Sequence, residues 1–214
     1  MLTIWGRRNS INVQKAMWAL GEVGVPHEHI DAGGEFGGLD TPEFGALNPN
    51  RRIPVLRDGD AVVWESSAIV RYLAARYGAG TLWNSDPALR AKADTWMAWA
   101  QTAPYREFID LFWGFVRTPP EGRDMAAMRA ANERMVKHLE LLDRELATRP
   151  YLAGDGFTMG DIPAGALLYR YFAMEFEHPS LPNLMAWYAR LNERPAYQAH
   201  VAIPFPEMWG RLDY

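Results

Sequence analysis

The sequence predicts a mixed α/β unit followed by an all-α unit, and three observations lead to this prediction. Strand and helix patterns alternate at close spacing over residues 1–77. From residue 87 onward, apolar residues recur only at helical spacing. A short segment with glycine and polar residues, 79–86, separates the two parts. We therefore expect an N-terminal domain at 1–78, a linker at 79–86 and a helical domain at 87–214.

The first half of the N-terminal unit reads as strand, helix and strand. Leu2 and Ile4 alternate with a polar residue, which is typical of a short strand. A helix with apolar residues at helical spacing follows over 13–23 and ends at Gly24. Residues 27–30 form a second predicted strand, and the glycine-rich stretch 32–50 is expected to be a loop with about one helical turn.

A hairpin and a helix complete this unit, so that its order is β-α-β-loop-β-β-α. Two apolar runs, 53–56 and 61–64, flank Asp58-Gly59, which is a strong hairpin signal. Pro54 cannot donate to a ladder, so we expect its strand to be irregular or at the sheet edge. The helix that follows is expected to end at Gly78.

The second half shows helical patterns throughout. Asp86-Pro87 is a favourable helix start, because Asp caps and Pro suits the first helical position. Thr158 to Asp161 has the spacing of a capping box and opens a helix through Tyr171, and 183–194 is a further helix ended by Pro195. Two apolar stripes are predicted to be buried: Leu89, Ala93, Trp96, Ala100 and Ala103, and then Met128, Met135, Leu139, Leu142 and Leu146.

Composition excludes several classes of function. Lys and Arg number 22 against 26 Asp and Glu, a net charge of −4, which argues against a nucleic-acid partner. The chain has no cysteine, so disulfides, thiolate metal ligands and a catalytic thiolate are excluded, and we expect no metal. It shows neither a signal peptide nor the roughly 20 apolar residues of a membrane span. We expect a cytoplasmic protein without a membrane partner.

Two predicted helix starts carry groups that suit an anionic ligand. A strand runs into a helix through Glu65-Ser66-Ser67, where free N–H groups favour a carboxylate or phosphate. Ser66 or Ser67 can also act as a plain helix cap there. Ser10 and Asn12 place a hydroxyl and an amide at the start of the first helix. If both starts face one groove, they can hold a small anion.

Together these segments resemble the cytosolic glutathione transferase superfamily, as a bacterial-type serine/asparagine member. In that family a thioredoxin-like N-terminal domain precedes an all-helical C-terminal domain. The resemblance spans nearly the whole chain, and the matching segments occur in family order. They are Ser10 to Lys15, Asn48 to Leu56, Glu65 to Leu73 and Thr158 to Ile162.

The resemblance implies a role for each residue of the glutathione site. Ile53 would offer its backbone to the cysteinyl part of glutathione, with Pro54 in the cis form. Glu65 and Ser66 would bind the γ-glutamyl amine and carboxylate. Ser10 would lie beside the sulfur as in serine-type members, and Asn12 falls where some bacterial members use an amide. Both residues stay candidates for activating the thiol.

Further site residues are expected from basic and aromatic segments. Arg8 and Arg52, with their neighbours Arg7 and Arg51, would meet the glycine carboxylate of glutathione or form a solvated basic surface. The aromatic segment from 103 to 115 would line the electrophile site or belong to the core. Its candidate residues are Tyr105, Phe108 and Phe112. The tail with Phe205, Trp209 and Tyr214 would cover the same cleft or cap the bundle.

The implied function is that of a glutathione transferase. The enzyme would bind glutathione as co-substrate, stabilise its thiolate and add it to a hydrophobic electrophile, and peroxidase or isomerase reactions stay open. A homodimer is expected from the family and from the hydrophobic helices at 66–77 and 88–115. The alternative is a non-catalytic glutathione-binding or protein-interaction module, since one fold can serve several functions.

Overall fold

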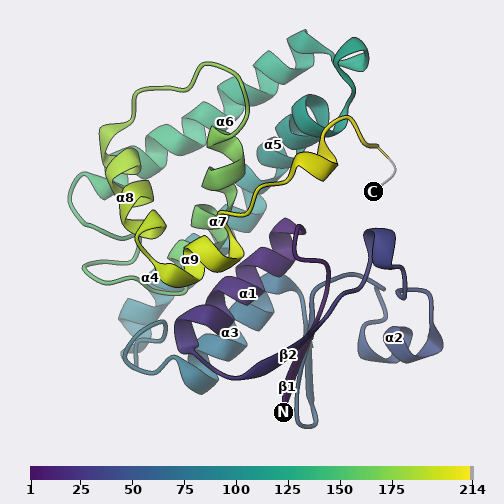
Figure 1. The fold of residues 1–214 in the computed structure, drawn as a ribbon. Coiled ribbons are helices and arrows are strands. Elements are labelled where there is room, and N and C mark those ends of the chain that lie inside the picture. Colours follow the sequence, from purple (N-terminus) through teal and green to yellow (C-terminus); the bar gives the residue numbers. More distant parts are fainter. Residues whose placement is uncertain (213–214) are drawn as a thin grey trace.

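The computed structural model describes residues 1–212, and its N-terminal part is built on a four-stranded mixed sheet (Figure 1). The strands lie in the order β2-β1-β3-β4, with β1 and β2 parallel and the other pairs antiparallel. Helices α1 and α3 lie together on the side of the sheet that faces the helical unit (Figure 1). The elements are β1 (Leu2–Trp5), α1 (Ile11–Val23), β2 (His27–Ile30), α2 (Pro42–Leu47), β3 (Val55–Asp58), β4 (Ala61–Trp64) and α3 (Ser66–Tyr77).

The predicted hairpin is confirmed, but its first strand is not an edge strand. Val55 pairs with Trp64 and Asp58 with Ala61, and Gly59 in the turn has a φ of 59°. Strand β3 lies between β1 and β4, where a proline would break a ladder. Pro54 avoids this conflict because it precedes the first residue of β3, after a cis bond.

Two local expectations for the N-terminal unit need correction. The glycine-rich stretch contains a full helix, α2, whose start Thr41 caps by accepting the N–H of Phe44 at 3.2 Å. Neither Ser66 nor Ser67 caps α3, because the cap position is Glu65 and both serines lie inside the helix. The prediction that this helix ends at Gly78 is confirmed, and a Cβ there would lie 2.9 Å from the carbonyl oxygen of Ala74.

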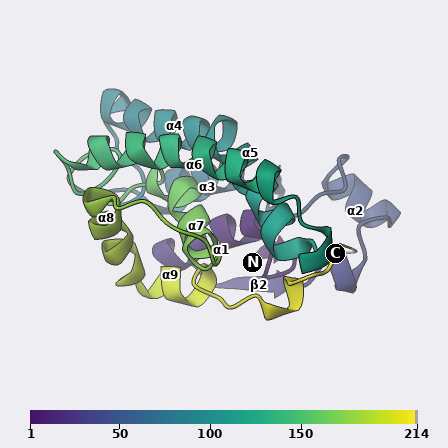
Figure 2. The same cartoon turned by 90° about the horizontal axis from the view of Figure 1, so that it is seen from above.

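The second part of the chain is all-helical, as predicted. Figure 2 shows α4, α5 and α6 on the outer side of this unit and α7 between them and α1. Nearly every residue of α7 is buried, because it packs against both α4 and α1. The elements are α4 (Pro87–Thr102), α5 (Pro104–Leu111), a π-helical segment (Phe112–Arg117), α6 (Met125–Leu146), α7 (Asp161–Phe172), α8 (Pro182–Asn192) and α9 (Pro195–His200).

The apolar stripe predicted for α6 is buried at all five positions, whereas the stripe predicted for α4 is partly wrong. Ala93, Met97 and Ala100 form the buried face of α4, and Leu89 is 41% exposed. Pro195 does end the preceding helix, but it also opens α9 as its first residue. A proline can act both as a stop signal for one helix and as a favourable first residue of the next, so the stop signal alone does not predict this start.

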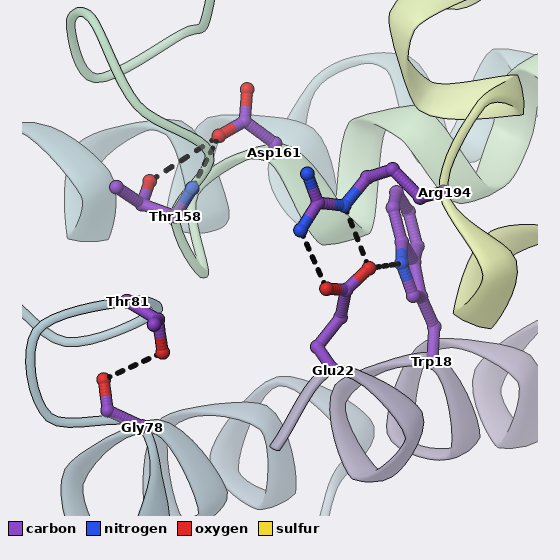
Figure 3. Close-up of polar contacts among 7 residues, drawn as sticks. All are labelled: Trp18, Glu22, Gly78, Thr81, Thr158, Asp161 and Arg194. Carbon is purple, nitrogen blue, oxygen red and sulfur yellow. Dashed lines mark hydrogen bonds and ion pairs between the residues drawn. The ribbon is translucent and has the colours of Figure 1, made fainter. Parts of the chain in front are cut away.

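A polar cluster joins the two units on the side away from the sheet (Figure 3). Arg194, which precedes α9, binds both carboxylate oxygens of Glu22 in α1, at 2.7 and 2.6 Å. The indole N–H of Trp18 donates to the same carboxylate at 2.8 Å. Helix α9 therefore ties the end of the chain to α1. None of the helices in residues 1–212 is long and apolar enough to cross a membrane.

Half of the capping box predicted at the start of α7 is formed, around the fully buried Asp161 carboxylate (Figure 3). The cap position is Gly160, and the Thr158 hydroxyl accepts the N–H of Gly160 and not that of Asp161. The Asp161 carboxylate accepts the N–H of Thr158 and the N–H of Leu152, each at 2.9 Å. The indole N–H of Trp187 donates to it as well, at 3.1 Å. Burial raises the pKa of Asp161 to about 6, although these hydrogen bonds act in the opposite direction.

Candidate functional site

The starts of α1 and α3 face one pocket, together with the loop that precedes β3. The pocket has a volume of about 370 Å³. Its lining includes Ser10, Asn12, Arg52, Ile53, Pro54, Glu65 and Ser66, all of which the sequence nominated. Arg7, Gly33, Gly34, Leu39 and Asn48 complete the lining. Residues that are far apart in the sequence thus meet at one end of the sheet.

A second, smaller pocket of about 280 Å³ adjoins the first and is built mainly from the helical unit. The two pockets share Arg7, Ser10, Asn12 and Arg52. The predicted aromatic residues of the electrophile site, Tyr105, Phe108 and Phe112, line the second pocket. Phe108 and Phe112 are also buried in the core, so this segment contributes both to the pocket wall and to the core. Ser10 and Asn12 lie at the boundary between the two chambers.

Two further expectations concern Arg8 and the C-terminal tail. Arg8 is exposed and lines neither pocket, whereas its neighbour Arg7 lines both. The tail reaches the second pocket through Met208, and Trp209 packs on Phe115 with ring centroids 6.1 Å apart. Tyr214, which was expected in the same tail, lies outside the described residues. The tail therefore contributes to the pocket, although through an apolar residue that the sequence did not single out.

In the loop before β3, Arg51 and Arg52 have different roles. Arg51 has a φ of 51° and donates to the carbonyl oxygens of Leu39 and Thr41, so it holds the loop together. Arg52 lines both pockets, and its own carbonyl oxygen accepts the side-chain amide of Asn48 at 2.8 Å. Of this pair, only Arg52 is placed to contact a ligand.

Ser10 occupies the cap position of α1 without using its side chain for capping. Its carbonyl oxygen accepts the N–H of Gln14 at 2.9 Å, which begins the helix. The chain before Ser10 passes close to α1, so that a Cβ at Gly6 would lie 2.5 Å from the Val13 side chain. The hydroxyl of Ser10 is thus available at the pocket wall, next to the positive end of the helix dipole.

Asn12 is held by side chains from three helices. Its Nδ2 donates to the Tyr105 hydroxyl at 3.1 Å. Its Oδ1 accepts from Lys15 Nζ at 3.1 Å and from Ser66 Oγ at 3.4 Å. Because both groups at Oδ1 are donors, the orientation of the amide is determined by its partners.

Glu65 stands at the junction of β4 and α3 in a left-handed conformation, with a φ of 70°. Such a conformation costs a non-glycine residue about 1–3 kcal/mol and is concentrated at functional sites. Glu65 remains exposed in the pocket wall, whereas Ser66 is buried. A carboxylate and the first N–H groups of a helix therefore lie side by side, and they suit a ligand with both an ammonium and a carboxylate.

Lys15 is a site residue that the sequence reasoning missed. Its side chain is buried, and burial lowers its pKa to about 7 although the charge of Glu65 acts to raise it. The ammonium lies 4.4 Å above the ring of Tyr105, whose own pKa is raised by burial. The helix period gives no signal for this residue, because every residue of α1 from 13 to 20 is buried.

Within residues 1–212, no group of three or more His, Asp or Glu side chains is arranged to hold a metal ion.

Comparisons with known proteins agree with this geometry. Residues 1–75 match the family model of the glutathione S-transferase N-terminal domain, and residues 125–190 match that of the C-terminal domain. Glutathione S-transferase GstB of Escherichia coli K12 is 45% identical over 206 residues, covering 95% of this chain and 99% of that protein. Glutathione S-transferase 3 of Zea mays is 33% identical over 213 residues, covering 96% of each.

A solved structure gives the same result. The theta class glutathione S-transferase from Xanthomonas axonopodis pv. citri, with glutathione bound, superposes with a TM-score of 0.91. It is 52% identical, and the match covers 95% of this chain and 98% of that one.

Proposed function

This chain belongs to the glutathione S-transferase family, and from that premise we propose how its two pockets carry out the transferase reaction. Glutathione occupies the larger pocket, with its sulfur at the boundary formed by Ser10 and Asn12. The electrophile occupies the smaller, aromatic pocket beside it. The observation that carries this proposal is the shared boundary: the two residues expected to activate the sulfur line both chambers.

The main-chain and charged groups of the larger pocket match the parts of glutathione. Glu65 pairs with the γ-glutamyl ammonium, and Ser66 with the first N–H groups of α3 binds the γ-glutamyl carboxylate. Ile53, before Pro54, offers its backbone to the cysteinyl part. Arg52 meets the glycine carboxylate. Arg8 has no part in this assignment, because it lies outside both pockets.

The reaction needs a thiolate, and the chain supplies the groups that favour it. A free thiol has a pKa of about 8.5, so only a few per cent is ionised at neutral pH. Lowering that pKa by about two units requires roughly 2.7 kcal/mol of preferential stabilisation. We assign the direct hydrogen bond to the glutathione sulfur to the Ser10 hydroxyl, because the Asn12 side chain already has three partners. The start of α1 adds the favourable end of its dipole.

The thiolate then attacks the electrophile without a protein nucleophile. Its lone pair forms the new carbon–sulfur bond, and the electrophile releases its leaving group or takes up the electron pair. Tyr105, Phe108 and Phe112 supply apolar surface for the electrophile. The hydroxyl of Tyr105 is held by Asn12 at the same boundary.

We further propose that the enzyme is a cytoplasmic homodimer with domains at 1–78 and 87–214, joined by a linker at 79–86. Cytoplasmic location and dimer formation are typical of the family. Leu89, exposed on α4, lies within one of the segments expected at the interface. Sedimentation should give about twice the chain mass of 24.3 kDa at micromolar concentration. A single species at the chain mass would contradict the dimer.

Calorimetric titration with glutathione tests the proposed site. Glu65→Ala and Ser66→Ala should each weaken glutathione binding by about 1–3 kcal/mol, since each leaves a charged group of the ligand unpaired. Glu140→Ala, on the exposed side of α6, is the matched control and should leave the affinity unchanged. Wild-type affinity in both site variants would contradict the assignment of the pocket. Turnover of a chlorinated aromatic electrophile then measures the transferase activity itself.

A further inference from the structure

A buried lysine stands directly behind the boundary of the two pockets. Lys15 is 3% exposed, and its Nζ donates to Asn12 Oδ1 at 3.1 Å. The same ammonium lies 4.4 Å over the Tyr105 ring. Asn12 in turn lines both pockets and donates to the Tyr105 hydroxyl. A single side chain therefore separates the lysine from the proposed position of the sulfur.

This placement is unfavourable for the fold taken alone. Burying an ammonium costs stability unless a counter-charge offsets it. Lys15 is also in the second turn of α1, near the end of the helix where the dipole disfavours a cation. A methionine of similar length would fill the same space without these costs, so the charge requires a functional explanation.

The groups around Lys15 leave room for one more anion. Glu65, at the start of α3, is the carboxylate that acts on it, and Glu65 is exposed in the pocket wall. Tyr105 on α5 faces the ammonium with its ring and stays neutral, since burial raises its pKa. Arg170 on α7 is a cation that acts on the same Tyr105 hydroxyl. A thiolate at the pocket boundary would add negative charge where positive charge now predominates.

We propose that Lys15 is the positioning residue that tunes the thiol of bound glutathione, by holding Asn12 and by placing a positive charge behind the thiolate. This inference rests on the proposed function. The lysine does not touch the sulfur and accepts no proton directly from it. Thiolate and ammonium stabilise each other across Asn12, so each favours the charged form of the other.

The pKa of the lysine agrees with this role. In the protein without glutathione, burial lowers the pKa of Lys15 to about 7, so part of this residue is neutral at physiological pH. When glutathione binds as thiolate, that fraction takes up a proton from solvent, while the thiol releases one to solvent. Net proton release on binding at pH 8 is therefore smaller than the release from the thiol alone. Calorimetry in buffers of different ionisation enthalpy measures this number.

Four variants separate charge from shape. Lys15→Met and Lys15→Gln remove the charge, and Gln keeps a donor for Asn12 Oδ1. Lys15→Arg keeps a charge that does not titrate in this range. Lys137→Met, on the exposed side of α6, is the matched control. The readouts are the ultraviolet absorbance of the bound thiolate against pH and the affinity for S-methylglutathione, which has no thiol to ionise.

The expected results follow from the charge. In Lys15→Met and Lys15→Gln, the pKa of the bound thiol should rise by about one unit, which lowers the thiolate fraction at pH 7 roughly threefold. Lys15→Arg and Lys137→Met should keep the wild-type thiol pKa. Binding of S-methylglutathione should stay within about twofold of wild type in every variant. In Lys15→Met, proton release per glutathione at pH 8 should exceed that of the wild type, because no lysine takes up a proton on binding.

Two results would overturn this inference. One is an unshifted thiol pKa in Lys15→Met, and the other is full retention of the low pKa in Lys15→Gln, which would assign the effect to orientation alone. Failure of the wild-type enzyme to bind S-methylglutathione would instead contradict the proposed function. The two failures are thus distinguishable.

Discussion

Replacing Asp161 by alanine should destabilise the protein strongly, because this carboxylate organises the start of α7. The substitution leaves the N–H groups of Leu152 and Thr158 and the indole N–H of Trp187 without their acceptor. Each unpaired buried donor costs about 1–3 kcal/mol, so the three together cost about 6 kcal/mol. Leu152 and Trp187 are fully buried, so water cannot replace the lost acceptor there.

One opposing effect reduces this cost. The pKa of Asp161 is raised from 3.8 to about 6 by burial. At neutral pH this shift corresponds to about 3 kcal/mol of unfavourable burial of the charge, which the substitution removes. The net expected loss in the free energy of unfolding is therefore about 3 kcal/mol.

Equilibrium urea unfolding, followed by tryptophan fluorescence, measures the difference. Asp155→Ala is the matched control, because Asp155 is an exposed carboxylate in the same loop. It should stay within about 0.5 kcal/mol of the wild type. If Asp161→Ala also stays within that range, or if the two variants lose equal stability, the account of the capping box is wrong.

Two further predictions concern the same fold. The pKa of Lys15 is lowered from 10.5 to about 7 in the folded protein. Between these two pH values the folded protein therefore binds fewer protons than the unfolded chain. Its stability should rise with pH from about 7 to 10.5. Relative to Lys15→Met, whose stability lacks this contribution, the rise should approach about 1.4 kcal/mol per pH unit, and parallel stability curves would contradict it. Glu22→Ala should lower the free energy of unfolding by about 2 kcal/mol, because Arg194 and the Trp18 indole lose their common partner. Thermal unfolding of Glu22→Ala, with Glu140→Ala as the control, checks this value. Equal melting temperatures of the two variants would count against the proposed link between the two units.

The sequence predicted the elements whose signals are local. Leu2 and Ile4 indicated a strand through their alternation, and Asp58-Gly59 indicated the hairpin through its turn chemistry. The five apolar positions of α6 were found because an isolated amphipathic helix has a clear period. At α4 the period was ambiguous because Trp96 and Met97 are adjacent: the buried face contains Met97, Trp96 is only half-buried, and Leu89 lies exposed in the first turn.

The site was accessible to sequence reasoning only in part. Ser10, Ile53 and Glu65 belong to motifs with fixed spacing, so a resemblance was enough to nominate them. Lys15 was missed because a lysine in a helix is normally exposed, and only the packing of α1 against α3 and α5 shows that its ammonium is enclosed. Arg8 was nominated although the adjacent Arg7 lines the pockets, since the direction of neighbouring side chains depends on a turn that the sequence does not define.

The central claim is that this pocket binds glutathione and stabilises its thiolate through Ser10. The most direct test is the absorbance of the bound thiolate as a function of pH in the wild type, Ser10→Ala and Asn12→Ala. We predict a wild-type thiol pKa about two units below the free value of about 8.5. Ser10→Ala should raise that pKa by about one unit or more and lower kcat/KM about tenfold, with little loss of glutathione affinity. A larger shift in Asn12→Ala than in Ser10→Ala, or no shift in either, would contradict the account.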